Sequence, residues 1–498
     1  MKFTAVVNTL VPGERWMGGL LPFDPLRELF RKLETMVRKE DIYLLLNTEV
    51  EKKLDRRTTG YRKIRVENLK SSDVFRTLYK TLSDYEDVLY LCIDTPLLDV
   101  EITKKMLELH QEEFAEYTYG EGFPHGFTPE IIHLDLFPKL AVLAEKEDSL
   151  ISRNSIFEAL SKEINSFDVE PFFSSEDFKM KRIELTTSLK RNSILVERIV
   201  REQGIDCGFE GFRELIHARP EMLRTVPAYV EMEITNRSEG NCIYSPLHAL
   251  ERERGEMEFE AFVVILGKIC DLSEDFHIEF SYLGESLLHG KISRILEHTL
   301  SNPHIHAILR TDGVLCTPSF SDYLAGLNTQ NLSIICELDA AQSETYKTIR
   351  QGDLNKVERN IRYLLSKLKK NVYVQMVRVD DNEEEMLKFY DLWEKEGARI
   401  IIQKYNSYLG LLPERSRHDL RPLERMCCWH LQRDLVVFHN GNVPRCKQDI
   451  NGIFLFGNLL KEDAPSVWER GLTHYTDHCE KKYDRYCAIC DEYYTFNF

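Results

Sequence analysis

From about residue 227 the sequence alternates six times between short apolar runs and longer amphipathic patterns. The apolar runs have the length of buried strands, and the segments between them have the period of helices. The expected strands are residues 229–234, 278–282, 306–309, 332–338, 372–379 and 399–403. The expected helices include residues 259–270, 291–300, 344–368 and 383–396. This repeat predicts a partial (β/α)6 barrel of parallel strands, with functional groups at the carboxyl ends of the strands.

Residues 1 to about 205 show a less regular alternation. Strands are expected at 3–8, 42–46 and 88–93, and helices at 25–37, 100–112 and 194–203. This pattern predicts a mostly parallel sheet that helices cover on both faces. Near residue 422 the pattern breaks into a short, turn-rich tail. We therefore expect an α/β protein with three domains, residues 1–205, 206–421 and 422–498.

The chain is acidic, and this limits its partners. Its 82 acidic and 65 basic residues leave a formal charge of −17. A protein that binds nucleic acid needs a basic face to neutralise phosphates, so nucleic acid is not an expected partner. No apolar run has the length of a membrane span, and the apolar start of the chain is too short for a signal peptide. We therefore expect a cytoplasmic protein without membrane contact.

Cysteine is concentrated at the carboxyl end of the chain. Half of the twelve cysteines follow residue 426, whereas the others are scattered singly, mostly in apolar runs. The clustered six are Cys427, Cys428, Cys446, Cys479, Cys487 and Cys490. In a reducing compartment such a group favours metal binding over disulfides. Four thiolates suffice for one [4Fe–4S] cluster, while a four-thiolate zinc site and idle or oxidised thiols remain as alternatives.

The cysteine-rich tail is expected to fold back on itself. Residues 435–438 have the pattern of a strand and residues 439–442 that of a hairpin turn, which would return Cys446 toward Cys428. This arrangement resembles the SPASM domain, the auxiliary iron–sulfur module appended to many radical S-adenosylmethionine (SAM) enzymes. Besides the cysteines, the residues that carry the resemblance are Gly441, Gly457, Asn458 and Trp468.

The resemblance to SPASM domains implies ligands and partners. It places Cys428, Cys446, Cys487 and Cys490 on the four ligand positions of one auxiliary [4Fe–4S] cluster. Cys427 and Cys479 are possible substitutes in that ligand set. A peptide, a protein or a redox partner is implied by what the tail does in SPASM enzymes.

The six-unit repeat upstream resembles a radical SAM barrel over residues 225 to 420, but its cluster motif is altered. After the first expected strand, Ser238, Cys242 and Ser245 occupy the spacing at which that family has three cysteines. A serine hydroxyl stays protonated near neutral pH and is a hard oxygen donor, which is poorly suited to an iron–sulfur cluster. Cys242 alone cannot hold the cluster, so the sequence does not favour SAM binding or cleavage.

Two further motifs of the radical SAM family appear in altered form. Gly284 and Glu285 follow the second expected strand, and Thr311, Asp312 and Gly313 follow the third. Glu285 and Asp312 are expected either to line a polar pocket at the barrel mouth or to be solvated loop residues.

Residues 1 to about 200 resemble the cytidylyltransferases that activate acidic or modified sugars. The matching segments are 5–7, 15–21, 94–97, 123–127 and 182–187. This resemblance implies a GT-A-like nucleotidyltransferase fold in which Arg15 and Asp94 contact the nucleotide and Mg²⁺. Gly19 stands in place of the family's lysine and Thr186 in place of an aspartate, and both losses weaken phosphate or Mg²⁺ binding. Alternatively, Asp94 only caps the turn before the helix that begins near residue 99.

The three regions together resemble the spiro-SPASM proteins. The resemblance implies an iron–sulfur protein with one auxiliary [4Fe–4S] cluster and no SAM cleavage, acting in redox chemistry or in peptide or protein recognition. The alternative is an active cytidylyltransferase with accessory carboxyl-terminal domains. The sequence assigns no catalytic residue and leaves open whether the protein is an enzyme.

Overall fold

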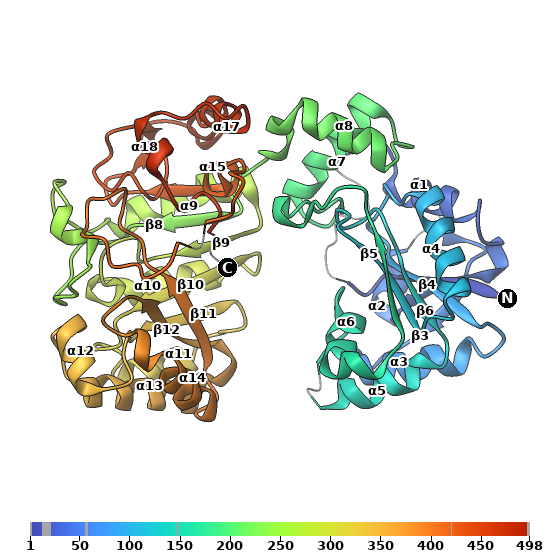
Figure 1. Ribbon diagram of the computed structural model, residues 1–498, viewed down its shortest axis with the longest axis horizontal. Helices are drawn as coiled ribbons and strands as arrows, with labels where there is room; N and C mark the ends of the chain where they lie inside the picture. The colour runs from blue at the N-terminus through green and yellow to red at the C-terminus, as the bar shows by residue number, and fades with distance from the viewer. Residues whose placement is uncertain (1, 12–20, 55–57, 147–148, 420, 496–498) are drawn as a thin grey trace. The chain divides into compact units, whose positions relative to one another are not determined.

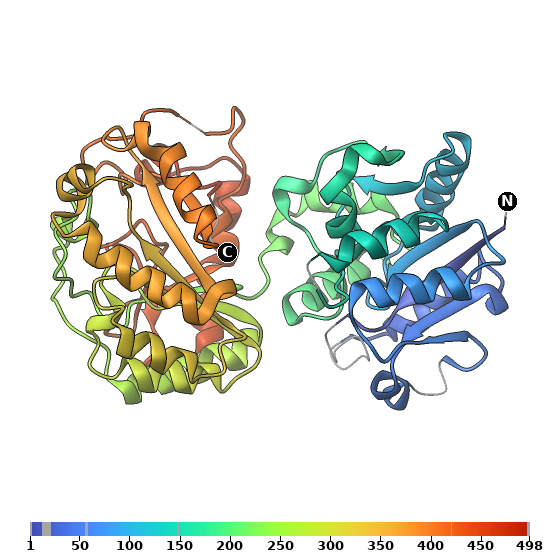
Figure 2. The same ribbon diagram turned by 90° about the horizontal axis from the view of Figure 1, so that it is seen from below.

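The computed structural model describes residues 2–11, 21–54, 58–146, 149–419 and 421–495. The chain forms two compact units, Met1–Leu223 and Arg224–Phe498. Each unit is built on its own sheet (Figures 1 and 2). Residues 206–223 belong to the first unit, and the cysteine-rich tail belongs to the second.

The first unit contains a mixed sheet of seven strands in the order β3-β2-β1-β4-β6-β5-β7. The strands are β1 (Phe3–Asn8), β2 (Ile42–Leu46), β3 (Arg62–Arg65), β4 (Asp87–Cys92), β5 (Tyr117–Glu121), β6 (Glu130–His133) and β7 (Val169–Phe173). Strands β1 to β4 pair in parallel, whereas β6 runs antiparallel to both β4 and β5. The expected mostly parallel sheet is therefore interrupted at β6.

Helices cover both faces of the first sheet. The helices of this unit are α1 (Pro25–Leu33), α2 (Thr48–Lys53), α3 (Ser71–Thr81), α4 (Val100–Glu112), α5 (Leu136–Glu145), α6 (Ser155–Leu160), α7 (Lys190–Gln203) and α8 (Phe209–Ala218). Alternate residues of β1 point to opposite faces, so Val6 packs in one apolar core and Ala5 and Val7 in another. The first core includes Phe75 of α3, and the second includes Leu29 of α1.

The second unit contains an all-parallel sheet of seven strands in the order β13-β12-β11-β10-β9-β8-β14. The strands are β8 (Tyr229–Met232), β9 (Phe276–Glu279), β10 (Ile305–Thr311), β11 (Leu332–Glu337), β12 (Val372–Arg378), β13 (Arg399–Lys404) and β14 (Asp434–Val437). All six strands expected from the repeat are present, with ends shifted by a few residues.

The helices between these strands pack on the second sheet through apolar faces. They are α9 (Phe259–Ser273), α10 (Ile292–Leu300), α11 (Pro318–Ala325), α12 (Ser343–Arg350), α13 (Leu354–Leu368) and α14 (Met386–Lys395). Phe262, Ile361 and Trp393 are fully buried in the core that they share with the strands. The single helix expected at 344–368 is two helices, because Gln351 adopts a left-handed conformation and Asp353 caps the start of α13.

The cysteine-rich tail is joined to the second sheet by β14. This strand pairs in parallel with β8, with Leu435 opposite Val230 and Val437 opposite Met232. The short helix α15 (Trp429–Arg433) directly precedes β14. After β14 the tail contains β15 (Asn442–Pro444), β16 (Leu455–Asn458), α16 (Ala464–Glu469), α17 (Leu472–Cys479) and α18 (Arg485–Ile489). Leu435 and Val437 share one apolar core with Phe262 and Ile278 of the central sheet.

The turn expected at 439–442 is present, but it does not close a two-stranded hairpin. The Phe438 N–H donates to the Asn442 carbonyl over 2.8 Å, and Gly441 has a φ of 82°. Strand β15 then pairs antiparallel with β16, whereas β14 pairs with β8. The strand expected from local pattern was therefore correct, while the residues that it pairs with lie 205 positions earlier in the sequence, as Leu435 and Val230 show.

The shared core predicts that damage to β14 destabilises the whole second unit. Leu435 is 3% exposed, so Leu435→Ala should lower the free energy of unfolding by about 2–5 kcal/mol, measured by chemical denaturation. Leu423 is fully exposed, and Leu423→Ala is the matched control, expected to change stability by about 0.5 kcal/mol or less. Separate unfolding of the tail, with the main transition unchanged, would contradict a common core.

Candidate functional site

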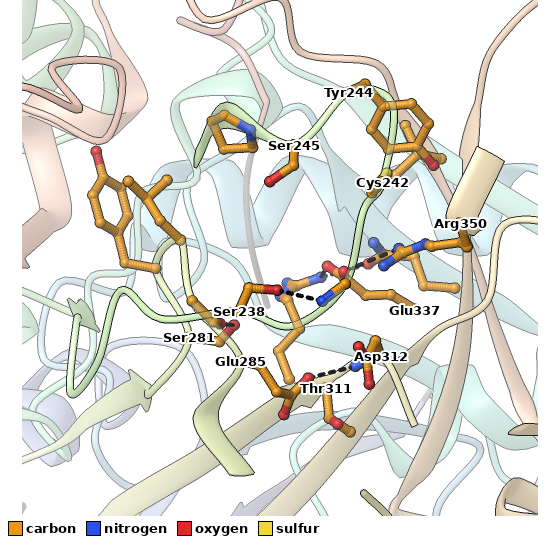
Figure 3. Close-up of a pocket in the computed structure, with 18 of the residues that line it drawn as sticks. Ser238, Cys242, Tyr244, Ser245, Ser281, Glu285, Thr311, Asp312, Glu337 and Arg350 are labelled. Carbon is orange, nitrogen blue, oxygen red and sulfur yellow. Dashed lines mark hydrogen bonds and ion pairs between the residues drawn. The ribbon is translucent and has the colours of Figure 1, made fainter. Parts of the chain in front are cut away.

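The second unit contains a cavity of about 410 Å³ at the carboxyl ends of its strands (Figure 3). Its walls come from the loops that follow β8, β9 and β10, from the ends of β11 to β13, and from Lys447 in the tail. This position is where the strand repeat predicts functional groups. The cavity is the candidate functional site of this unit.

Ion pairs hold the floor of the cavity. Arg310 of β10 donates to Glu279 of β9 over 2.7 Å and to the Gln375 amide oxygen over 2.7 Å. Glu279 also accepts a hydrogen bond from the buried Tyr229 hydroxyl. Burial alone would lower the pKa of Arg310, but Glu279 and Glu337 raise it above its usual value. Arg310 is therefore a fixed cation in the wall.

A second buried arginine closes the cavity on the side of β11. Arg350, from α12, donates to Asp339 over 2.7 Å and to Glu337 over 3.1 Å. Asp339 is fully buried, and its other carboxylate oxygen accepts the Val377 N–H over 2.7 Å. Asp339 has a φ of 64°, in the left-handed region that few non-glycine residues adopt. The ion pair and the backbone bond together hold Asp339 in this conformation.

The altered cluster motif lies at the cavity mouth, where its two serine hydroxyls accept hydrogen bonds from backbone N–H groups of their own loop. The Ser238 hydroxyl accepts the Gly240 N–H over 3.2 Å. The Ser245 hydroxyl accepts the Leu247 N–H over 3.3 Å and caps the short helix η7 (Pro246–Ala249). Burial raises the pKa of the Cys242 thiol to about 11, so it stays protonated at neutral pH. Figure 3 shows the three side chains spread around the cavity. This donor set does not fit a three-thiolate cluster.

Glu285 lines the cavity and is 7% exposed, so it is not a solvated loop residue. Its carboxylate accepts the Leu287 N–H over 3.0 Å and the Asp312 N–H over 2.8 Å (Figure 3). Burial and the nearby Asp312 carboxylate raise the pKa of Glu285 to about 8. Gly284 lies against the Thr235 carbonyl, where a Cβ atom would clash with backbone. The turn therefore needs glycine at 284.

The six clustered cysteines separate into one disulfide and four free thiols. Cys427 and Cys479 form a disulfide, with Cα atoms 4.8 Å apart. For these two cysteines the bond matches the alternative of oxidised thiols rather than the favoured metal binding. It also removes both proposed substitutes from the free thiols. The remaining four are Cys428, Cys446, Cys487 and Cys490.

The four free thiols lie within electrostatic reach of one another. Burial raises the pKa of Cys428 well above its usual value, and Cys490, Cys446 and Cys487 raise it further. Within the described ranges, no group of three or more His, Cys, Asp or Glu side chains is arranged to hold a metal ion. The structure thus places near one another the four thiols that the resemblance implies as cluster ligands. It does not show what they bind.

Asp94 in the first unit is engaged in an ion pair. Arg153 donates to one carboxylate oxygen over 2.6 Å, while the other oxygen is buried and has no hydrogen-bond partner among the described residues. Asp94 does not cap α4, because the Asp99 carboxylate accepts the Glu101 and Ile102 N–H groups, each over 3.0 Å. A guanidinium beside the carboxylate opposes the approach of Mg²⁺, so this aspartate does not fit a magnesium site.

The other residues expected at a nucleotide site are less informative. Arg15 and Gly19 lie outside the described residues. The Thr186 hydroxyl accepts a hydrogen bond from Asn192 over 2.9 Å. A cavity of about 400 Å³ in this unit is lined by part of the motif at 123–127 together with Arg153 and Glu130. Burial raises the pKa of Glu130 to about 7.

The charged residues that hold the cavity floor were not predicted from the sequence. Glu279 and Arg310 are the acidic and basic residues of β9 and β10, and a charge in a buried strand is a usable signal because it requires a partner. No comparable sequence signal marks Arg153 as the partner of Asp94, because Arg153 lies in a polar segment 59 residues away.

Fold and site define an α/β protein with a charged cavity at strand ends and a cysteine-rich tail in the same unit. An uncharacterized protein of Treponema pallidum (strain Nichols) is 31% identical over 358 residues, which are 69% of this chain and 98% of that protein. The chain belongs to the family of this Treponema pallidum protein. No family model matches it.

Other comparisons give weaker likenesses. A probable GTP 3′,8-cyclase of Methanococcus vannielii is 28% identical over 203 residues, 39% of this chain and 63% of that protein. The structure of Streptococcus suis SuiB bound to precursor peptide SuiA covers 72% of this chain and 86% of its own, with 13% identity and a TM-score of 0.45. A cytidylyltransferase from Leptospira borgpetersenii covers 45% of this chain and 96% of its own, with 15% identity and a TM-score of 0.38. At these TM-scores neither structure bears on the activity of this chain.

Among the described residues, no helix is both long and apolar enough to cross a membrane.

The raised pKa of Glu285 predicts a loss of stability as pH rises from about 4.5 to about 8. Burial and the Asp312 carboxylate raise this pKa from 4.5 to about 8 in the folded protein. The folded state therefore keeps a proton that the unfolded chain has already released, and stability falls across this window. Asp312→Asn removes the opposing charge but keeps an oxygen that can accept the Val314 N–H. This variant should lose less stability than the parent between about pH 5 and 9, by about 1.4 kcal/mol per pKa unit restored.

Thermal unfolding across that pH range measures this difference. Glu239→Gln is the matched control, because Glu239 lines the same cavity but is exposed. Equal pH dependence of the parent and the Asp312→Asn variant would show that Asp312 does not raise the pKa of Glu285.

Proposed function

We propose that this protein binds one auxiliary [4Fe–4S] cluster through Cys428, Cys446, Cys487 and Cys490. The proposed cluster serves electron transfer or recognition of a peptide or protein at the cavity of the second unit. The chain's own part in this function is to bind and orient a ligand at the carboxyl ends of the strands. The cluster, when bound, would supply one-electron redox chemistry.

The observation that carries this proposal is that the cysteine-bearing loops also build the cavity. Lys447 directly follows Cys446 and lines the cavity, and its carbonyl accepts a hydrogen bond from the Tyr282 hydroxyl over 2.7 Å. Glu492 lies two residues after Cys490 and accepts a hydrogen bond from Lys404, another lining residue, over 2.7 Å. One or two residues therefore separate these cysteines from the cavity wall.

The ligand set favours an iron–sulfur cluster over zinc. Four thiolates around one zinc ion lie about 3.8 Å apart, given a Zn–S distance of about 2.3 Å. The described thiols are not grouped for a single ion, although all four are free and near one another. A four-iron cluster places each thiolate on a different iron, which suits a looser group. With four thiolates bound, no iron has an open position for a substrate.

The cavity mouth supports the proposal that SAM is not cleaved there. Ser238 and Ser245 already accept backbone N–H groups, and Cys242 is a protonated thiol. At most one of the three, Cys242, can provide a thiolate, whereas a catalytic cluster with one open iron needs three. The proposed cluster in the tail therefore takes no part in SAM cleavage.

The alternative of an active cytidylyltransferase has weaker support. Asp94, the residue expected to bind Mg²⁺, is paired with Arg153. The first unit keeps a cavity near this pair, and we propose that it binds a ligand without metal-dependent transfer.

Iron and sulfide analysis after anaerobic purification tests the cluster. We expect about four irons per chain, lost in the Cys487→Ser, Cys490→Ser double variant. Cys270→Ser is the matched control, because Cys270 is a free, half-buried cysteine outside the tail, and it should keep the iron. Stoichiometric zinc in the parent protein, or iron retained by the double variant, would overturn the ligand assignment.

The altered motif predicts that the reduced protein does not cleave SAM. Incubation with SAM under reducing conditions should yield no 5′-deoxyadenosine. The electron paramagnetic resonance spectrum of the reduced protein should not change when SAM is added, because the proposed cluster has no open iron. Formation of 5′-deoxyadenosine, or a spectral shift on adding SAM, would contradict the assignment.

A further inference from the structure

The disulfide in the tail joins two segments that lie far apart in the sequence. Cys427 directly precedes Cys428 at the start of α15, and Cys479 is the last residue of α17, 52 residues later. Both cysteines are partly exposed. They pack in one apolar cluster with Cys428, Cys446 and Tyr475. The bond thus lies beside Cys428 and Cys446, two of the four free thiols.

Other contacts hold the same segments in place. The Tyr475 hydroxyl of α17 donates to Gln432 of α15 over 3.1 Å. The Trp429 N–H donates to the Tyr493 carbonyl over 2.9 Å. The buried Arg224 donates to the Leu431 carbonyl over 2.9 Å. The Tyr475–Gln432 bond joins α15 to α17 without the disulfide, and the other two contacts hold α15 to neighbouring segments, so we expect the tail to stay folded when the disulfide opens.

Exposure and independent packing distinguish this bond from a structural clamp. A buried disulfide that alone joins two segments resists reduction until the protein unfolds, whereas an accessible bond between packed segments can open and close in the folded protein. We propose that the Cys427–Cys479 disulfide is a redox-active site that exchanges two electrons with an external dithiol. This inference goes beyond the proposed cluster and does not require it.

The exchange balances as a thiol–disulfide reaction. A thiolate of the dithiol attacks one sulfur of the Cys427–Cys479 bond, forming a mixed disulfide and releasing the other cysteine as a thiolate, which takes up a proton. The second thiol of the reductant then displaces the remaining cysteine. The protein gains two thiols and the reductant becomes a disulfide, so two electrons and two protons pass to the protein. Oxidised dithiol reverses both steps.

Alkylation of the full-length folded protein at graded ratios of reduced to oxidised dithiothreitol tests the proposal. After quenching with iodoacetamide, intact mass and peptide mapping report which cysteines were free. We expect Cys427 and Cys479 to become alkylated together as the ratio rises, to be protected again on reoxidation, and to leave the thermal unfolding transition cooperative.

Two variants make the assignment specific. The Cys427→Ser, Cys479→Ser double variant should lose the titration, whereas Cys270→Ser should leave it unchanged. The Cys487→Ser, Cys490→Ser variant, which removes two proposed iron ligands, should keep the titration. Loss of iron and loss of disulfide exchange are therefore separate results.

Three outcomes would overturn the proposal. The bond could stay closed under excess dithiothreitol until denaturant is added, which would make it a structural clamp. Both cysteines could be alkylated without reductant, which would show that no disulfide forms in solution. Finally, reduction could unfold the second unit irreversibly, which would exclude reversible exchange.

Discussion

The parallel pairing of β14 with β8 is the contact on which the second unit depends. It makes the cysteine-rich tail part of the central sheet, since Leu435 and Val437 enter the core of the unit. The chain then turns at Gly441 and returns along the end of the sheet, which places Lys447, directly after Cys446, at the cavity. Together with the Tyr282–Lys447 and Lys404–Glu492 hydrogen bonds, this strand pair fixes the cysteine-bearing segments relative to the cavity.

Much of the secondary structure could be predicted from local pattern. Residues 3–8, 42–46 and 100–112 were expected with the ends that the structure shows for β1, β2 and α4. These elements combine clear periodicity with capping residues such as Asp99. The break between α12 and α13 was missed, because a single left-handed residue at Gln351 leaves hydrophobic periodicity unchanged on both sides.

The features that could not be predicted are contacts between residues distant in sequence. The partner of β14, the pairing of Asp94 with Arg153 and the Cys427–Cys479 bond all depend on the tertiary fold. Local pattern reports which face of a segment is buried but not what covers it. The cysteine spacing did indicate that the tail carries chemistry, while which cysteines pair and which stay free required the structure.

The paired charges of the cavity also restrict what it can accept. Arg310, Arg350, Lys404 and Lys447 each already contact a carboxylate. An anionic ligand would have to displace those carboxylates, and the free energy needed to break the existing ion pairs would weaken its binding. A neutral ligand rich in hydrogen-bonding groups meets no such competition, and its affinity would vary little with ionic strength. The four cations of the wall are therefore available to an anionic ligand only where it displaces a carboxylate.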